Sequence, residues 1–315
     1  MKLKTKVHQL VFICIACIVG TLIYFQNDSP SAVESTKISS NTDLVKTKTK
    51  SKENIESQSI SPLSSYPDKT DAISFLFKQI KRVDWYFDDG LLAHFSLLQS
   101  KADNGDNEAS FILSMNLRYC YSAAFDEDSL DSKLTEASQY SDAELAMQSI
   151  QDKYEYCLGI EASSTHEFHH YLLQPAKNGY VQAQEELGKM SPEFFMASQG
   201  FDKLEREEFI RIRDDFEQKK LSFLEEAAKN GSVRALKRLS RMYSSQKYGS
   251  NGLVKAYAMN HLILEITEDS ELYSQHSWLN QKLHDKLTPK ELDMALNTSE
   301  NWLEIIVRNG TIYPH

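Results

Sequence analysis

A stripe of small and apolar residues recurs three times along this chain and constrains its fold more than any other feature. The clearest copy, within Leu221 to Tyr243, consists of Leu224, Ala228, Gly231, Ala235, Leu239 and Tyr243, at steps of three or four residues. Such steps place side chains on one helix face. We expect the glycine to end one helix in the left-handed conformation, after Lys229 in its last turn, and Ser232 to cap the next. The segment therefore predicts a helical hairpin whose alanines allow close helix packing.

The same spacing occurs twice earlier in the sequence. One copy is Leu98, Ala102, Gly105, Ala109 and Leu113, and the other is Leu172, Ala176, Gly179, Ala183 and Leu187. Three copies of one helical hairpin predict a repeat protein.

The copy AKNGYVQAQEELG, Ala176 to Gly188, resembles the Sel-one-like repeat family, relatives of the tetratricopeptide repeat. The shared signature is an alanine, a glycine three residues later, an alanine four residues after that, and a Leu-Gly pair. Residues 255–266 (KAYAMNHLILEI) resemble the first helix of another repeat, and residues 287–302 (LTPKELDMALNTSENW) resemble a tail that often ends such chains. The resemblance implies an all-α, right-handed solenoid of antiparallel helical hairpins over residues 70–315, used for protein contacts and not for chemistry.

The segments between the clear copies give further expectations. Residues 71–87 have an apolar pattern that predicts an amphipathic helix. A degenerate hairpin, with a capping box from Ser141 to Glu144, is expected to fill the gap between Gly105 and Gly179, after an acidic loop at 126–132. The charged residues 204–220 predict a solvated helix with ion pairs between neighbouring turns. Thr288 and Glu291 predict a capping box at the start of a final helix.

The first 26 residues predict a membrane anchor. Lys2, Lys4 and Lys6 precede an apolar run from Leu10 to Phe25 that contains no charge. The positive residues before this run are expected to remain in the cytoplasm, so that the C-terminal body lies outside it. For a bacterium this predicts a single-pass inner-membrane protein with a periplasmic repeat domain; a cleaved signal peptide or a lipidated Cys17 are the alternatives.

Residues 27–69 form a linker in this interpretation. They are rich in Ser, Thr and Lys, contain three prolines, and show no apolar periodicity. Such a composition cannot bury enough surface to offset the entropy of ordering, so a disordered tether is expected.

Charge restricts the partners of the body. The chain has a net charge of −10; because residues 1–69 together carry +3, residues 70–315 carry −13. A surface of this sign repels phosphate backbones, so nucleic acid is not an expected partner and a basic protein is. The sequence does not indicate an oligomeric state.

Two cysteines lie in the body, Cys120 and Cys157, and their separation of 37 residues matches one repeat step. Counting from the two turns places them near the ends of what would be successive second helices. In an oxidising compartment this arrangement predicts a disulfide, and two separate buried thiols are the alternative.

The segment HEFHH provides the only catalytic candidate we considered. His166, Glu167 and His170 match the H-E-x-x-H pattern, which on a continuous helix holds zinc between two imidazoles and places a carboxylate beside it. No third-ligand continuation follows, and no P-loop or dinucleotide fingerprint occurs, so no metal, cofactor or catalytic site is expected.

We therefore expect a membrane-tethered periplasmic scaffold or adaptor for protein contacts. An immunity protein that neutralises a toxin delivered to the periplasm is the first alternative, and a zinc-dependent peptidase that uses His166, Glu167 and His170 is the second.

Overall fold

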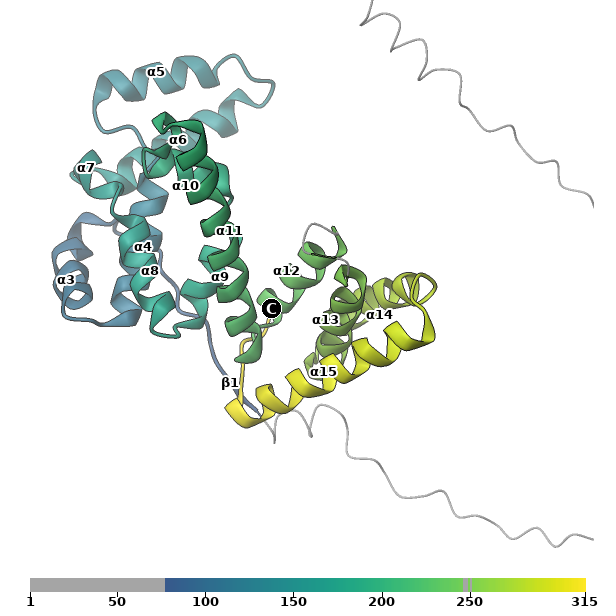
Figure 1. Cartoon of the computed structure of the whole chain (residues 1–315). Coiled ribbons are helices and arrows are strands. Elements are labelled where there is room, and N and C mark those ends of the chain that lie inside the picture. The colour runs from purple at the N-terminus through teal and green to yellow at the C-terminus, as the bar shows by residue number, and fades with distance from the viewer. Residues whose placement is uncertain (1–76, 246–248, 250) are drawn as a thin grey trace, which may run out of the picture. The chain divides into compact units, whose positions relative to one another are not determined.

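The protein is almost entirely helical over the residues that its computed structural model describes, 77–245, 249 and 251–315, all within one compact unit (Figure 1). The helices are α3 (Leu92–Asp103), α4 (Asn107–Cys120), α5 (Glu127–Ala137), α6 (Ala143–Cys157), α7 (Ala162–Thr165), α8 (Phe168–Lys177), α9 (Val181–Lys189), α10 (Pro192–Ser198), the short 3-10 helix η1 (Phe201–Lys203), α11 (Arg206–Lys229), α12 (Val233–Ser244), α13 (Gly252–Ile266), α14 (Ser270–His284) and α15 (Pro289–Asn309). Two short strands, β1 (Lys78–Gln79) and β2 (Thr311–Ile312), pair in parallel. The all-α prediction is confirmed.

The three predicted hairpin turns have the same backbone structure. Gly105, Gly179 and Gly231 have φ values of 88°, 85° and 80°. In each turn the glycine N–H donates to the carbonyl three residues before it, and the following residue donates to the carbonyl five residues before itself, which is the Schellman motif. Ser232 then caps α12 by accepting from the N–H of Ala235 at 2.9 Å, as predicted. The sequence pattern therefore identified three equivalent helix ends.

The repeated apolar residues form the seams between the helices. Leu113, Leu172, Leu187, Leu224 and Leu239 are at most 1% exposed, and the alanines that face them are buried, except for half-buried Ala102. Two hydrophobic cores result, one built mainly from α3 to α11 and the other from α11 to α15.

Each hairpin packs on the next through a fixed order of contacts. Within the hairpins α3 packs on α4, α8 on α9, α11 on α12, and α13 on α14. Between hairpins the second helix packs on the following first helix, so α4 contacts α8, α9 contacts α11, and α12 contacts α13. The final helix α15 packs on α13 and α11.

The hairpin α5–α6 does not occupy the place that the sequence predicted for it. Since α4 packs directly on α8, residues 121–167 leave the series of hairpins and return to it; in Figure 1 α5 and α6 lie above α4 and α8. We call residues 121–167 the insertion. The predicted acidic loop at 126–132 is wrong, because α5 begins at Glu127, and Ser141 is not the cap of α6, which begins after Asp142.

The predicted disulfide is present and closes the insertion. Cys120 ends α4 and Cys157 ends α6, with Cα atoms 5.6 Å apart. The pairing was predicted from neighbouring repeats, whereas the bond instead joins the insertion to the helix from which it departs.

Residues 77–87 form an extended strap and no helix, so the helix predicted over residues 71–87 is wrong in its described part. Residues far away in the sequence supply the hydrogen-bond partners of the strap backbone. Lys78 pairs with Thr311 in the β1–β2 ladder, and Gln182 on α9 accepts from the N–H of Val83 at 3.0 Å. Phe77 is buried in the second core. Long-range contacts therefore override the local helical periodicity.

The C-terminal predictions are confirmed in most details. Thr288 and Glu291 form the capping box of α15, and Ile306 is fully buried. Leu296 on the same helix is 36% exposed. The predicted membrane anchor, residues 1–26, and the linker, residues 27–69, lie outside the described residues.

Candidate functional site

The HEFHH segment does not form the helix that a zinc peptidase requires. Helix α7 ends at Thr165 and α8 begins at Phe168, so His166 and Glu167 lie in the turn between them. His166 contacts the ring of Tyr121, with centroids 5.0 Å apart, while His170 contacts Tyr171. The pattern therefore does not lie on one continuous helix.

The remaining histidine of the segment, His169, is half-buried. Its ring lies 4.9 Å from that of Phe195, and burial lowers its pKa to about 4. No group of three or more metal-ligating side chains is found within residues 77–245, 249 and 251–315.

A pocket of about 450 Å³ lies between α9 and α12, and we call it the α9–α12 pocket. It is formed by the second helices of two successive hairpins, which contact each other directly. Leu224 and Ala235 line it but are almost fully buried, and most of the remaining lining is basic: Lys189 from α9, and Arg234, Lys237, Arg238 and Arg241 from α12. The pocket is thus a positively charged hollow on a body whose net charge is −13.

The amphipathic sequence of α12 explains how four cations reach one face. Val233, Leu236, Leu239 and Tyr243 are buried, which leaves Arg234, Lys237, Arg238 and Arg241 on the opposite side of the helix. These four residues are separated by three or four positions, so they are neighbours on the helix surface.

None of the four cations on α12 forms a salt bridge with any described residue. Arg238 makes one long contact, from its Nη2 to the carbonyl of Lys189 at 3.5 Å, and its buried Nε has no acceptor within the described chain. Burial and the nearby charges of Arg241 and Arg234 lower the pKa of Lys237, although Asp269 opposes the shift.

Helix α11 provides a contrast within the same hairpin. It carries ion pairs between successive turns, Arg211–Glu208, Lys219–Asp215 and Lys220–Glu217. These pairs confirm the predicted ion-paired helix. The absence of such pairs on α12, over the described residues, is therefore a property of that helix and not of the whole surface.

The two carboxylates at the pocket edge are already engaged by other cations. Arg82 of the strap holds Glu185 with both guanidinium Nη atoms, one of them 2.9 Å from Oε1, and Ser232 donates to the same oxygen. Arg118 lies 3.1 Å from Glu186. Since Glu185 and Glu186 have these partners, they neutralise the α12 cations incompletely.

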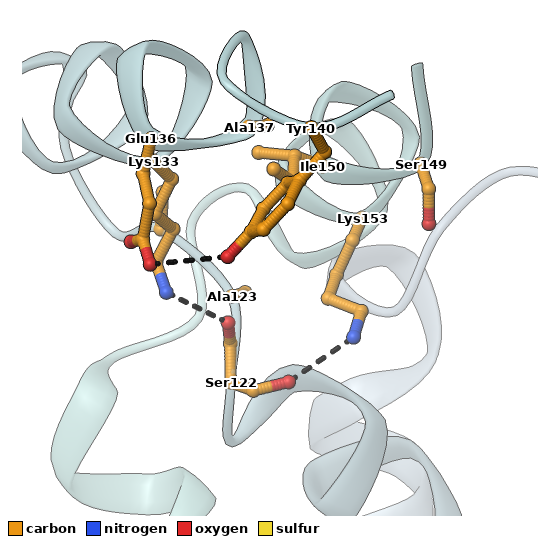
Figure 2. A pocket seen from close by; sticks show the side chains of 10 residues that line it. Ser122, Ala123, Lys133, Glu136, Ala137, Tyr140, Ser149, Ile150 and Lys153 are labelled. Atoms are coloured by element: carbon orange, nitrogen blue, oxygen red, sulfur yellow. Dashed lines mark hydrogen bonds between the residues drawn. The ribbon is translucent and has the colours of Figure 1, made fainter. Parts of the chain in front are cut away.

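A second hollow, of about 260 Å³, lies within the insertion and is shown in Figure 2. Lys133 from α5 and Lys153 from α6 converge on Ser122, where Lys133 donates to the backbone oxygen at 3.3 Å and Lys153 to the hydroxyl at 3.1 Å. Burial and then the charge of Lys133 lower the pKa of Lys153. The two ammonium groups therefore link α5 and α6 to Ser122 at the start of the insertion.

Comparisons of the chain with protein-family models, with curated proteins and with solved structures found no match. Among the described helices, none is long and apolar enough to cross a membrane.

The sequence analysis missed the cations of the α9–α12 pocket. Their signal was present as R-x-x-K-R-x-x-R, residues 234–241, in which every cation falls on one side of a helix. The net negative charge of the body predicts basic partners instead. The sequence could not reveal that the two carboxylates lining the pocket, Glu185 and Glu186, belong to ion pairs with Arg82 and Arg118.

Proposed function

We propose that residues 77–315 are a diverged Sel-one-like array, a right-handed α-solenoid, that works as a scaffold for protein contacts without catalytic activity. The observation that carries the proposal is the packing order, in which each second helix contacts the next first helix: α4 with α8, α9 with α11, and α12 with α13. Arrays built this way bury a continuous core and offer extended side surfaces to partners.

Three identical helix ends at Gly105, Gly179 and Gly231 support the same proposal, because equivalent hairpins need equivalent turns. The zinc-peptidase alternative receives no support, since His166 and Glu167 lie in the turn before α8 and only His170 lies on that helix.

We further propose that residues 1–26 anchor the protein in the inner membrane and that residues 27–69 tether an array located in the periplasm. The Cys120–Cys157 disulfide supports this location, because disulfides persist in oxidising compartments and are rare in the cytosol.

An immunity protein remains the second candidate, favoured by one observation. The net charge of −13 on residues 70–315 suits a basic toxin and would speed its association.

Crosslinking of the full chain in intact cells, followed by identification of the captured proteins, tests these proposals. A scaffold is expected to capture a resident envelope protein reproducibly, whereas an immunity protein is expected to capture a secreted toxin. Failure to enrich any protein over a chain of the same length with scrambled residues 77–315 would contradict both.

A further inference from the structure

We infer that the α9–α12 pocket binds an acidic segment of a partner protein. The inference rests on the proposed protein-binding function and adds the chemistry of one contact, carboxylates received by Arg234, Lys237, Arg238 and Arg241.

The first argument is the cost of the arrangement in the free protein. Arg234–Lys237 and Arg238–Arg241 are three residues apart, and Arg234–Arg238 and Lys237–Arg241 are four apart, so each pair places like charges side by side on α12. Like-charge pairs at these spacings destabilise a helix. On α11, three pairs of residues at the same spacings have opposite charges and form salt bridges. An anionic ligand would remove the repulsion on α12.

The second argument is the incomplete hydrogen bonding of Arg238. Its Nε is buried without an acceptor in the described residues, and its Nη2 makes a single contact at 3.5 Å. Buried donors of this kind are normally paired, because leaving them unpaired costs free energy. A carboxylate accepts from a guanidinium in the bidentate geometry that arginine favours, and would supply the missing acceptor.

The third argument is shape, which favours a peptide over other polyanions. A hollow of about 450 Å³ has the size of sites that take small ligands. A nucleic acid would extend well beyond this hollow and meet a body whose net charge is −13. A few acidic residues of a protein satisfy the pocket without that penalty.

A direct binding experiment tests the inference with the full chain in detergent. The probe is a fluorescently labelled hexaglutamate peptide, compared with hexaglutamine and hexalysine by fluorescence anisotropy. We expect hexaglutamate alone to bind, with an affinity that falls as salt is added. The variant Arg234→Gln/Arg241→Gln removes two exposed cations of the pocket and is expected to weaken binding about tenfold or more.

The matched control is Arg211→Gln/Arg213→Gln, which removes the same charge from exposed positions on α11 outside the pocket. It should change hexaglutamate affinity less than about twofold, as expected of distant surface charges. Thermal unfolding of both variants checks the fold, and the α12 variant should be at least as stable as the parent because two arginines that repel their neighbours are gone.

Three results would overturn the inference. The parent chain could fail to bind hexaglutamate, or the two double variants could weaken this binding equally. In the third case, the α12 variant would lose binding to phosphatidylglycerol vesicles and would still bind hexaglutamate as the parent does. The last result would assign the pocket to a lipid surface.

Crosslinking in cells separates this inference from the proposed function. If the α12 variant captures the same protein as the parent while hexaglutamate does not bind, the pocket inference fails and the scaffold proposal stands. If the parent chain captures no protein but hexaglutamate binds at α12, the scaffold proposal fails and the pocket chemistry stands.

Discussion

Gly231 and Gly179 occupy equivalent turns, yet replacement of each by alanine should have very different consequences. Both have a left-handed backbone, with φ of 80° and 85°. A Cβ added at Gly179 meets nothing within 4 Å, whereas at Gly231 it would lie 2.1 Å from the carbonyl oxygen of Thr311. At Gly231, therefore, the C-terminal strand passes where a side chain would stand.

The magnitude follows from the contacts that must break. Alanine in the left-handed conformation costs about 1 kcal/mol at either position. At Gly231 the displaced strand also loses the bonds from Tyr313 N–H to the Gly231 carbonyl and from Val233 N–H to the Tyr313 carbonyl. At about 1 kcal/mol for each bond, Gly231→Ala should lower the free energy of unfolding by about 3 kcal/mol in total, against about 1 for Gly179→Ala.

Urea unfolding of the two variants and the parent, followed by circular dichroism, gives these free energies. Hydrogen exchange provides an independent check, because the amides of Val233 and Tyr313 should exchange faster in Gly231→Ala and at the parental rate in Gly179→Ala. Equal destabilisation of the two variants, to within about 0.5 kcal/mol, would refute the reasoning. So would faster exchange at Val233 in both.

Three further predictions concern the disulfide, a buried histidine and a buried ion pair. Replacement of both Cys120 and Cys157 by alanine should lower the free energy of unfolding by about 4 kcal/mol, because the disulfide closes a loop of 37 residues. Hydrogen exchange should become faster in α5 and α6 but not in α12 and α13, since α4 packs directly on α8 without the insertion. Burial lowers the pKa of His276 from 6.5 to about 4, so the unfolded chain binds the proton more readily than the folded one. The free energy of unfolding should therefore fall by up to about 3 kcal/mol as pH drops from about 6.5 to 4. The variant His276→Gln should flatten this part of the plot of unfolding free energy against pH. Arg82→Ala leaves the 6%-exposed carboxylate of Glu185 without its ion-pair partner and should lower the free energy of unfolding, measured in urea, by about 3 kcal/mol. Adding Glu185→Gln should restore part of this loss.

Each of these predictions has a result that contradicts it. Faster exchange spread evenly over all helices of the disulfide variant would show that the insertion is not an independent unit. An unchanged pH profile in His276→Gln would assign the acid sensitivity to other groups. Full destabilisation that persists in the Arg82→Ala variant carrying Glu185→Gln would show that packing of the arginine stem, and not its charge, stabilises the strap.

The sequence predicted what depends on neighbouring residues. The turns at Gly179 and Gly231, the cap at Ser232 and the box at Thr288 all follow from interactions within a few positions, and the structure contains each of them. Local chemistry of this kind does not require knowledge of the remaining fold.

The errors occurred where distant residues decide the structure. Residues 77–87 have helical periodicity, but they are held extended by hydrogen bonds that their backbone N–H groups donate to Gln182 and to the carbonyls of Gly310 and Ile312. The insertion was counted as a repeat because its length fits, although α4 packs on α8 instead. The pairing of Cys120 with Cys157 was predicted correctly from a spacing argument that described a different neighbour relation.

Candidate site residues divide in the same way. The cations at 234–241 are visible as a helical pattern, because their shared face depends only on helix geometry. The sequence does not indicate that they form no salt bridge with a described residue, nor that distant Arg82 and Arg118 pair with Glu185 and Glu186 in the same pocket.

The attachment of the strap decides where tension enters the molecule. Among the described elements, a pull from the N-terminal side reaches β1 before any helix. β1 pairs with β2, which follows the last helix, α15, and Arg82 binds Glu185 on α9 in the middle of the series. Such a force is therefore shared between the centre and the end of the array, and does not peel α3 away first. If residues 1–69 anchor and tether the protein as proposed, these two attachments bear the load while the helices remain assembled.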